Sequence, residues 1–161
     1  MAAGKGKGGT GESGIKIIAE NRKARAAYTV DEKVEAGLSL SGSEVKALRA
    51  GTANLADAYA LPKGSELYLL NAHIGTYNPS SFFAHEPLRG RKLLMHREEI
   101  DRWITKVRER GYSIIPLLLY FKNGRAKVEL GLCRGKTHED RRQDIKERET
   151  KREMDRAMRR R

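Results

Sequence analysis

The chain has 161 residues, of which 39% are hydrophobic and 34% are charged, and this composition fits one small domain with solvated segments outside its core. Its 33 lysines and arginines exceed its 21 aspartates and glutamates, and the formal net charge of +12 favours a polyanionic partner. No stretch has the length and apolarity of a membrane span, and the first residues lack the apolar block of a secretory signal. We therefore expect a cytoplasmic protein with no membrane partner.

The chain begins with a polar, glycine-rich segment over residues 1–14, which cannot offset the entropy of ordering by burial. We expect this segment to be a flexible basic arm. The folded body follows over residues 15–133 and starts with a basic cluster beside an aromatic ring. Cations next to an aromatic side chain suit phosphate contacts combined with stacking on a base. The members of this cluster are Arg22, Lys23, Arg25 and Tyr28.

Apolar and polar residues alternate over residues 28–41, and this period of two predicts a long, half-buried strand. Glu35 falls on the polar side of the strand. A carboxylate inside a basic surface accepts hydrogen bonds from base amino groups or holds an arginine in place, and the alternative is an ordinary outward-facing strand residue.

A short helix is predicted over residues 41–51, because Ser41 and Glu44 have the spacing of a capping box and Gly51 suits a helix end. Lys46 and Arg49 are three residues apart and share one face of this helix. Such a face is equally typical of an RNA-binding surface and of an ordinary solvated surface. The next two segments, over residues 53–61 and 66–74, are separated by a turn-forming stretch and predict a hairpin.

A second helix is predicted over residues 96–111, since its apolar stripe has helical spacing, acids fill its first turn and bases its last, and Gly111 follows. Trp103 belongs to this stripe, and we expect it in the core. His96 stands just before the helix.

The strongest hairpin signal is Asn123-Gly124, the dipeptide of a type I′ turn, between apolar segments over residues 112–121 and 125–133. Pro116 removes one hydrogen-bond donor and predicts an edge or a bulge. Lys127 lies on the polar side of the last strand. In total, about five or six strands and two or three helices predict a mainly β fold, a small antiparallel barrel of the oligonucleotide-binding kind.

An enzymatic alternative is a small nuclease that uses His85 with Glu86 and Arg89 for general acid–base chemistry. Alternatively, His85 is an ordinary exposed loop residue that happens to precede an acid. We favour this second interpretation. The single cysteine, Cys133, and the spacing of the four histidines argue against a metal site, and no phosphate-binding glycine loop lies between a strand and a helix. We therefore expect no catalytic activity, no metal and no cofactor.

The tail over residues 134–161 carries 12 lysines and arginines and only a few scattered apolar residues, so it lacks a stripe that could pack on the body. Its acids stand four residues before bases, as in Asp144 with Arg148, and such pairs stabilise a helix only slightly. We expect a tail that is disordered when free and helical when docked in a strongly anionic channel or groove.

Several ordered blocks of the chain resemble the SsrA-binding protein family, also called small protein B (SmpB), over essentially residues 15–158. The blocks are "NRKARAAYTVDEKVEAGLSLSGSEVKALRAGTANLADAY", "RKLLMHREEID", "LYFKNGRAKVELGLCRGK" and "DRRQDIKERE". The resemblance implies an oligonucleotide-binding-like β-barrel that binds the tRNA-like domain of transfer-messenger RNA. It also implies a role in the rescue of stalled ribosomes, called trans-translation, with elongation factor Tu in the delivery complex.

The resemblance carries RNA contacts over to matching positions in this chain. The implied RNA-binding residues are the cluster from Asn21 to Arg25, Glu35, Lys46, Arg49, Leu94 and His96, extended by Lys127 and Arg134. The tail from Gly135 is implied to enter the decoding centre and the empty message channel. Its implied contacts are Lys136, Asp140, Arg141 and Arg142 near the decoding centre, with Ile145, Lys146 and Arg148 leading into the helix.

The chain departs from the family pattern at a few positions. Where many relatives have an aromatic residue or histidine before the tail aspartate, this chain has Glu139, with His138 one residue earlier as a possible substitute for stacking. Ala157 and Met158 stand where a larger apolar pair is common, which predicts weaker docking there. The alternative reading of the whole chain is a basic ribosomal or ribosome-assembly protein.

Overall fold

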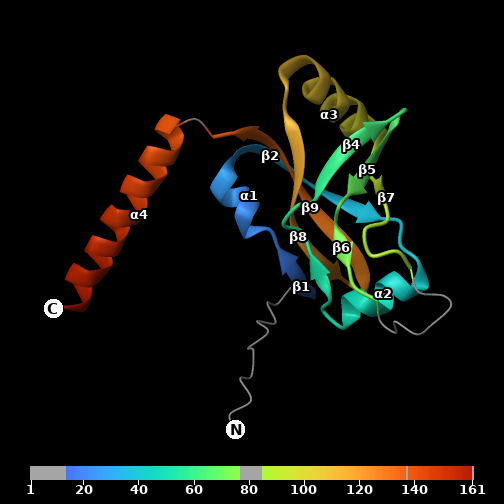
Figure 1. Ribbon diagram of the computed structural model, residues 1–161, viewed down its shortest axis with the longest axis horizontal. Helices are drawn as coiled ribbons and strands as arrows, with labels where there is room; N and C mark the ends of the chain where they lie inside the picture. Colours follow the sequence, from blue (N-terminus) through green and yellow to red (C-terminus); the bar gives the residue numbers. More distant parts are fainter. Residues whose placement is uncertain (1–13, 77–84, 137, 161) are drawn as a thin grey trace, which may run out of the picture.

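The computed structural model describes residues 14–76, 85–136 and 138–160 (Figure 1). Antiparallel strands form the body, short helices cover parts of it, and a long helix follows at the carboxyl end. The elements in chain order are β1 (Ile15–Glu20), α1 (Arg22–Ala27), β2 (Tyr28–Leu38), α2 (Gly42–Arg49), β3 (Ala53–Asn54), β4 (Tyr59–Lys63), β5 (Glu66–Leu70), β6 (His73–Ile74), β7 (Arg91–Leu94), α3 (Arg97–Arg110), β8 (Ser113–Lys122), β9 (Arg125–Gly135) and α4 (His138–Arg159).

The main sheet closes into a ring through β8. Its strand order is β1-β8-β4-β5-β7-β2-β9, and β9 pairs again with β8. The amino-terminal part of β8 reaches β4 through Ala60 and Ile114, whereas its carboxyl-terminal part pairs with β1. The ring of antiparallel strands confirms the predicted fold class, a mainly β fold with short helices.

The interior of the ring is filled from the sheet and from two helices. Trp103 and Ile100 of α3 and Leu48 of α2 are each at most 3% exposed and belong to one core cluster with the strands. Burial of an apolar side chain of this size contributes about 1.5 to 3 kcal/mol each. The predicted second helix and the core position of Trp103 are therefore confirmed, and Gly111 ends the helix with a φ of 67°.

The last hairpin forms at the predicted turn. Asn123 and Gly124 both have positive φ, 51° and 78°, as a type I′ turn requires. The pairing of β8 with β9 shifts register between Pro116 and Leu118, which is the irregularity that the proline predicted. β9 continues to Gly135, two residues beyond the expected end of the body.

The predicted capping box of α2 also forms, and one of its members serves a second purpose. Ser41 and Glu44 exchange their reciprocal hydrogen bonds at the start of the helix. Glu44 is fully buried and forms an ion pair with Arg91, which is also fully buried. It forms a second ion pair with Arg89, whose Nη2 atom lies 2.5 Å from Glu44 Oε1. Arg91 in turn donates to the Ala72 carbonyl oxygen at 2.7 Å. This buried network attaches α2 to the start of β7.

Several elements were not predicted from the sequence. Strand β1, helix α1 and strand β7 have only four to six residues each, too few for a clear periodic pattern. β3 and β6 are paired segments of two residues at the base of the predicted hairpin, whose longer arms are β4 and β5.

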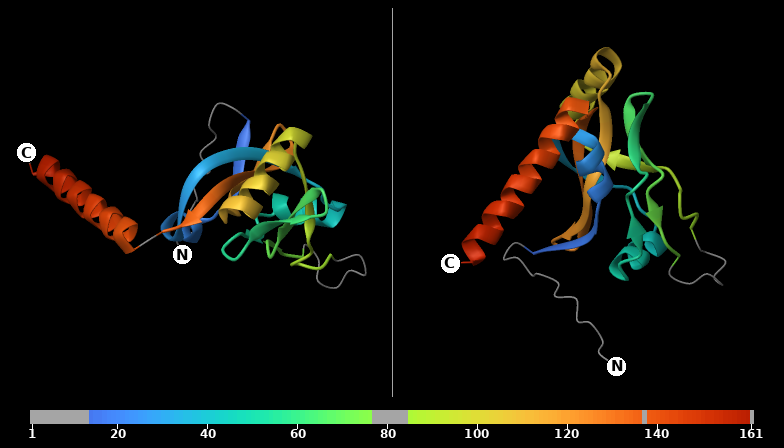
Figure 2. Two further views of the ribbon diagram at one scale, coloured as in Figure 1. Left: turned by 90° about the horizontal axis from the view of Figure 1, so that it is seen from above. Right: turned by 60° about the vertical axis from the view of Figure 1, so that its left-hand side comes forward.

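The tail differs from expectation in one respect, since residues 138–159 form one continuous helix in the structure rather than a disordered segment (Figure 2). Acids in its first turn and arginines in its last complement the helix dipole, and its charge pairs have helical spacing. Apart from His138, whose side chain lies outside the described part, every side chain up to residue 160 is exposed except the half-buried Asp140 and Asp144. Because α4 gains little from packing, we expect it to be the least stable helix.

Among the described residues, no helix combines the length and apolar character needed to cross a membrane.

The buried ion pair predicts acid sensitivity. Burial acts to raise the pKa of Glu44, but hydrogen bonds from the Ser41 amide, Arg91 and Arg89 outweigh it and lower the pKa to about 2 from an ordinary value of 4.5. A depressed folded-state pKa means that this stabilisation is present above the ordinary pKa and is lost as the pH falls toward 2.

We expect Glu44→Ala to lower the free energy of unfolding at neutral pH by about 3 to 5 kcal/mol, because it leaves Arg91 buried without its partner. Urea unfolding measures this loss, and its size should shrink between about pH 5 and pH 2. Glu86→Ala, at an exposed position, is the control and should stay within about 0.5 kcal/mol of the wild type. Equal stability of Glu44→Ala and the control would contradict the assignment.

Candidate nucleic-acid interface

A groove lies where β2, β7 and β9 meet the start of α3. It has a volume of about 540 Å³ and brings together predicted RNA-binding residues that are far apart in the sequence. Its lining includes Glu35, Gly37, Lys92, Leu94, His96, Arg97 and Lys127. Because β2 pairs with both β7 and β9, the closed sheet itself assembles this lining.

A second hollow, of about 340 Å³, adjoins the groove and shares Gly37, Leu94 and Lys127 with it. Val45 of α2 and Arg125, next to the hairpin turn, line its other side. Exposed Lys46 and Arg49 lie on the same short helix as Val45. We call the lining of both hollows, together with these two residues, the groove surface.

Close packing of β2 against β7 depends on a glycine. A Cβ atom at Gly37 would lie 3.2 Å from the Cβ atom of Leu94, its register partner, so a larger residue would push the strands apart. Leu94 is 52% exposed, which leaves an apolar surface inside a charged groove.

Cations of the groove surface divide into paired and unpaired groups. Lys92 and Arg97 both face Glu66, at 4.0 and 3.5 Å. Within the described part of the chain, Lys46, Arg49 and Arg125 form no ion pair. These three exposed cations are therefore available to phosphate groups.

Glu35 is an acid of the groove surface that lies beside Lys122 and Lys127. Its Oε2 atom accepts a hydrogen bond from the Tyr120 hydroxyl at 2.5 Å and lies 3.5 Å from Lys122 Nζ. The hydrogen bond from Tyr120, aided by the charges of Lys122 and Lys127, lowers the pKa of Glu35 below its usual range against the effect of burial. Glu35 is thus an ionised hydrogen-bond acceptor.

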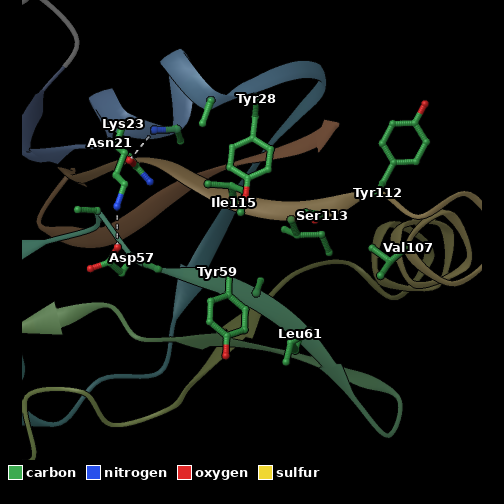
Figure 3. A pocket seen from close by; sticks show the side chains of 16 residues that line it. Asn21, Lys23, Tyr28, Asp57, Tyr59, Leu61, Val107, Tyr112, Ser113 and Ile115 are labelled. Carbon is green, nitrogen blue, oxygen red and sulfur yellow. Dashed lines mark hydrogen bonds and ion pairs between the residues drawn. The ribbon is translucent and has the colours of Figure 1, made fainter. Parts of the chain in front are cut away.

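The predicted cluster around α1 lies elsewhere on the body. In Figure 1, α1 lies on the side of the body that faces α4, whereas α2 lies at the lower right, on the opposite side. Lys23 and Tyr28 line a hollow of about 420 Å³ there, together with Tyr59 and Tyr112 (Figure 3). The structure thus separates the predicted RNA-binding residues into two groups.

Asn21, which the resemblance assigned to RNA contact, has a structural role in the fold. It is 2% exposed, and its side-chain amide donates to the carbonyl oxygens of Leu55 and Pro116, each at 3.0 Å. Its side-chain oxygen accepts from the amide of Ala24 at 3.0 Å and so caps α1. These bonds hold the Asn21 side chain within the protein, so Asn21 positions α1 beside the hollow that it also lines.

The cations of α1 are exposed but have acidic neighbours. Arg25 and Arg22 lie 2.8 and 3.9 Å from Glu20, and Lys23 lies 3.0 Å from Asp57. Exposed ion pairs of this kind each contribute only about 0 to 1 kcal/mol to stability. A phosphate group can therefore replace the acid as the partner of these cations at small cost.

The tail begins directly beside α1. Gly135 pairs with Tyr28 in the register of β9 and β2, and the Lys136 amide donates to the Ala27 carbonyl oxygen at 3.2 Å. Lys136 Nζ donates to the Arg25 carbonyl oxygen at 3.1 Å and forms an ion pair with Asp144 of α4. We call Arg22, Lys23, Arg25, Tyr28, Arg134 and Lys136 the tail-root surface.

The remaining predicted tail residues lie along α4. Asp140 is half-buried, whereas the others are exposed. The exposed residues are Arg141, Arg142, Ile145, Lys146, Arg148 and Met158. His138 opens the helix, but its side chain lies outside the described part.

The residues of the nuclease hypothesis are occupied in the structure. His85 makes hydrogen bonds through both ring nitrogens, to Ser43 Oγ at 2.9 Å and to the Ile74 carbonyl oxygen at 3.0 Å. Arg89 binds Glu44. These contacts give His85 and Arg89 roles within the fold, so the geometry adds no specific support to the nuclease hypothesis. In the described ranges, no group of three or more potential metal ligands gathers.

Sequence reasoning missed several residues of the groove surface. Arg125 had a usable signal, because it directly follows the predicted turn on the same strand as Lys127. Lys92 had none, since β7 was not predicted. Arg97 lies in the predicted second helix, but no local signal placed the start of that helix beside β2 and β9. Tyr120 had none either, because its hydroxyl reaches Glu35 from another strand.

Known proteins resemble the chain over nearly its full length. A family model described as SmpB protein matches residues 18–160. The chain is 78% identical to the SsrA-binding protein of Myxococcus xanthus (strain DK1622), over 99% of each protein. It is 60% identical to the SsrA-binding protein of Anaeromyxobacter sp. (strain Fw109-5), over 97% of this chain and 94% of that protein.

A solved structure agrees with the sequence matches. It is described as "tmRNA-SmpB: a journey to the center of the bacterial ribosome", and one of its chains is 42% identical to this chain, with a TM-score of 0.63. The match covers 79% of this chain and 93% of that chain. By its sequence and its fold, the chain belongs to the SmpB protein family.

Proposed function

We propose that the protein binds the tRNA-like domain of transfer-messenger RNA and delivers it to stalled ribosomes for trans-translation. Relatives 78% and 60% identical to the chain are named SsrA-binding protein, and a matching solved chain comes from a tmRNA-SmpB ribosome structure. The observation that carries the proposal is the groove surface, which combines the unpaired cations Lys46, Arg49 and Arg125 with the ionised acceptor Glu35 and the exposed Leu94.

The chemistry of the groove surface fits a folded RNA. Lys46, Arg49 and Arg125 attract phosphates and set the orientation of the RNA, which is a contact without sequence information. Glu35 repels phosphate and accepts hydrogen bonds from bases or from ribose hydroxyls. Leu94 offers an apolar contact to a base or a sugar face. A surface that combines these groups favours a particular RNA shape over a generic duplex.

The tail takes a different role, which follows from its exposure. A helix of 22 residues is about 33 Å long, and from Arg141 to Arg159 every side chain of α4 except the half-buried Asp144 is exposed. Such a rod suits a vacated message channel walled by ribosomal RNA. In this proposal Lys136, Asp140, Arg141 and Arg142 act near the decoding centre, with Ile145, Lys146 and Arg148 further along. Elongation factor Tu accompanies the complex during delivery.

The first test concerns the three unpaired cations. We expect weaker binding to the tRNA-like domain from each of the variants Lys46→Ala, Arg49→Ala and Arg125→Ala. Each should also reduce the steepness of log K plotted against the logarithm of the salt concentration by about one unit. Titrations between about 50 and 200 mM salt measure this slope. Arg110→Ala, which removes an exposed cation at the end of α3, is the matched control. Identical slopes for the control and all three variants would contradict phosphate contact at the groove surface.

The second test concerns RNA preference. We expect the full chain to bind a transcript of the tRNA-like domain more tightly than a duplex of equal length and charge, with the difference persisting as salt weakens both. Competition binding at two salt concentrations measures the preference. A ribosomal or assembly protein would instead show equal affinity for both RNAs while binding a ribosomal RNA fragment tightly.

The third test separates the tail from the body. A chain that ends at Gly135 should keep its affinity for the tRNA-like domain within a few-fold, because α4 leaves the groove surface uncovered. Peptide tagging in a reconstituted stalled-ribosome assay should be lost. The double variant Arg159→Ala/Arg160→Ala, which removes charge only at the helix end, is the control and should retain most tagging. Normal tagging by the truncated chain would refute the role proposed for the tail.

A further inference from the structure

Tyr120 makes a part-buried hydrogen bond that crosses one strand of the sheet. The tyrosine lies on β8 opposite Lys127 of β9, while Gly37 of β2 lies opposite the same lysine on the other side. The Tyr120 side chain is 6% exposed, and its hydroxyl reaches over β9 to Oε2 of Glu35 at 2.5 Å. Core packing would need only the ring, so the hydroxyl calls for a separate explanation.

The two oxygens of Glu35 have different surroundings. Oε2 accepts from Tyr120 and lies 3.5 Å from Lys122 Nζ. Within the described part of the chain, no hydrogen bond reaches Oε1. The side chain is 37% exposed and lines the groove, so one oxygen is held by the protein while the other remains accessible to a ligand.

Cations alone would not orient this carboxylate well. Lys122 and Lys127 are long and flexible, and a charge attraction between exposed groups has little directional preference. The hydroxyl of a buried tyrosine has few rotatable bonds and donates along one direction. A short hydrogen bond from such a donor fixes the rotamer of Glu35 and keeps the carboxylate ionised.

Given the RNA-binding function proposed above, on which this step rests, we propose that Tyr120 is a positioning residue for RNA recognition. It holds Oε2 of Glu35 so that Oε1 accepts one hydrogen bond from a donor on the bound RNA. That donor is a base amino group or a ribose 2′-hydroxyl. Because Oε2 is held by Tyr120, Glu35 contacts the RNA through Oε1 and does not use its two oxygens to bind a pair of adjacent donors on one base edge.

The central experiment is a double-mutant cycle between Tyr120→Phe and Glu35→Gln, with a transcript of the tRNA-like domain as the probe. Tyr120→Phe keeps the ring and removes the hydroxyl, and we expect it to weaken binding by about tenfold, as for loss of a hydrogen bond to a charged group. In the Glu35→Gln background the same change should alter affinity by no more than about twofold. Equal losses in both backgrounds would overturn the proposal, because Tyr120 would then act by another route.

A matched control tests whether the loss of any tyrosine hydroxyl weakens RNA binding. Tyr68→Phe makes the same chemical change on β5, and the Tyr68 hydroxyl makes no hydrogen bond within the described part of the chain. We expect its affinity to remain within about twofold of the wild type. A loss at Tyr68→Phe equal to that at Tyr120→Phe would overturn the specific role of Tyr120.

A second readout needs no RNA and no variant. Carboxyl-carbon NMR on the wild-type protein measures the pKa of Glu35, which we expect below the ordinary value of 4.5 because of the Tyr120 hydroxyl. Tyr120→Phe should raise this pKa. A wild-type pKa at or above the ordinary value would overturn the proposal even if the phenylalanine variant fails to fold. Conversely, a lowered pKa with no preference for the tRNA-like domain would reject the proposed function and leave the positioning contact intact.

The donor on the RNA can be identified with single-atom changes. Transcripts with one 2′-deoxy substitution each test the ribose hydroxyls. Transcripts in which inosine replaces one guanosine, purine riboside replaces one adenosine or pyrimidin-2-one riboside replaces one cytidine test the base amino groups. The substitution at the contacted nucleotide should weaken binding to the wild type and lose this effect with Glu35→Gln. If no substitution in either series depends on Glu35, the single-donor contact is refuted.

Discussion

The structure depends on the pairing of β8 with three other strands. One side of β8 pairs with β9, and the other side pairs first with β4 and then with β1, so this strand closes the ring. Closure leaves β2 between β7 and β9, which is the arrangement that gathers Glu35, Leu94 and Lys127 in one groove. The buried pair of Glu44 with Arg91 then attaches α2 beside it.

The two basic surfaces are separate, so the molecule can make two different contacts at once. The groove surface is rigid, because it rests on paired strands and on buried side chains. The tail-root surface combines exposed cations with the start of α4, and Lys136 connects α1 to that helix through Arg25 and Asp144. One molecule can therefore bind a folded RNA on one surface while its helix extends into another anionic environment. A net charge of +12 favours both encounters.

Local signals in the sequence predicted the elements that they determine. The capping box of α2, the apolar stripe of α3 and the Asn123-Gly124 turn each act within a few residues, and each formed where expected. Non-local arrangements could not be predicted in this way. The sequence placed Asn21 in a basic cluster, yet its partners Leu55 and Pro116 are 34 and 95 residues away. The contact between Glu35 and Tyr120 spans 85 residues, and only the closed sheet brings the two together.

The central claim is that the groove surface, rather than the tail, recognises the folded RNA. The most direct measurement is an NMR titration of the isotopically labelled full chain with the tRNA-like domain. The account predicts that backbone signals of β2, β7, β9 and α2 around Glu35, Leu94 and Lys127 shift or broaden first. Changes confined to α4, with the signals of these strands unaltered at saturation, would contradict it.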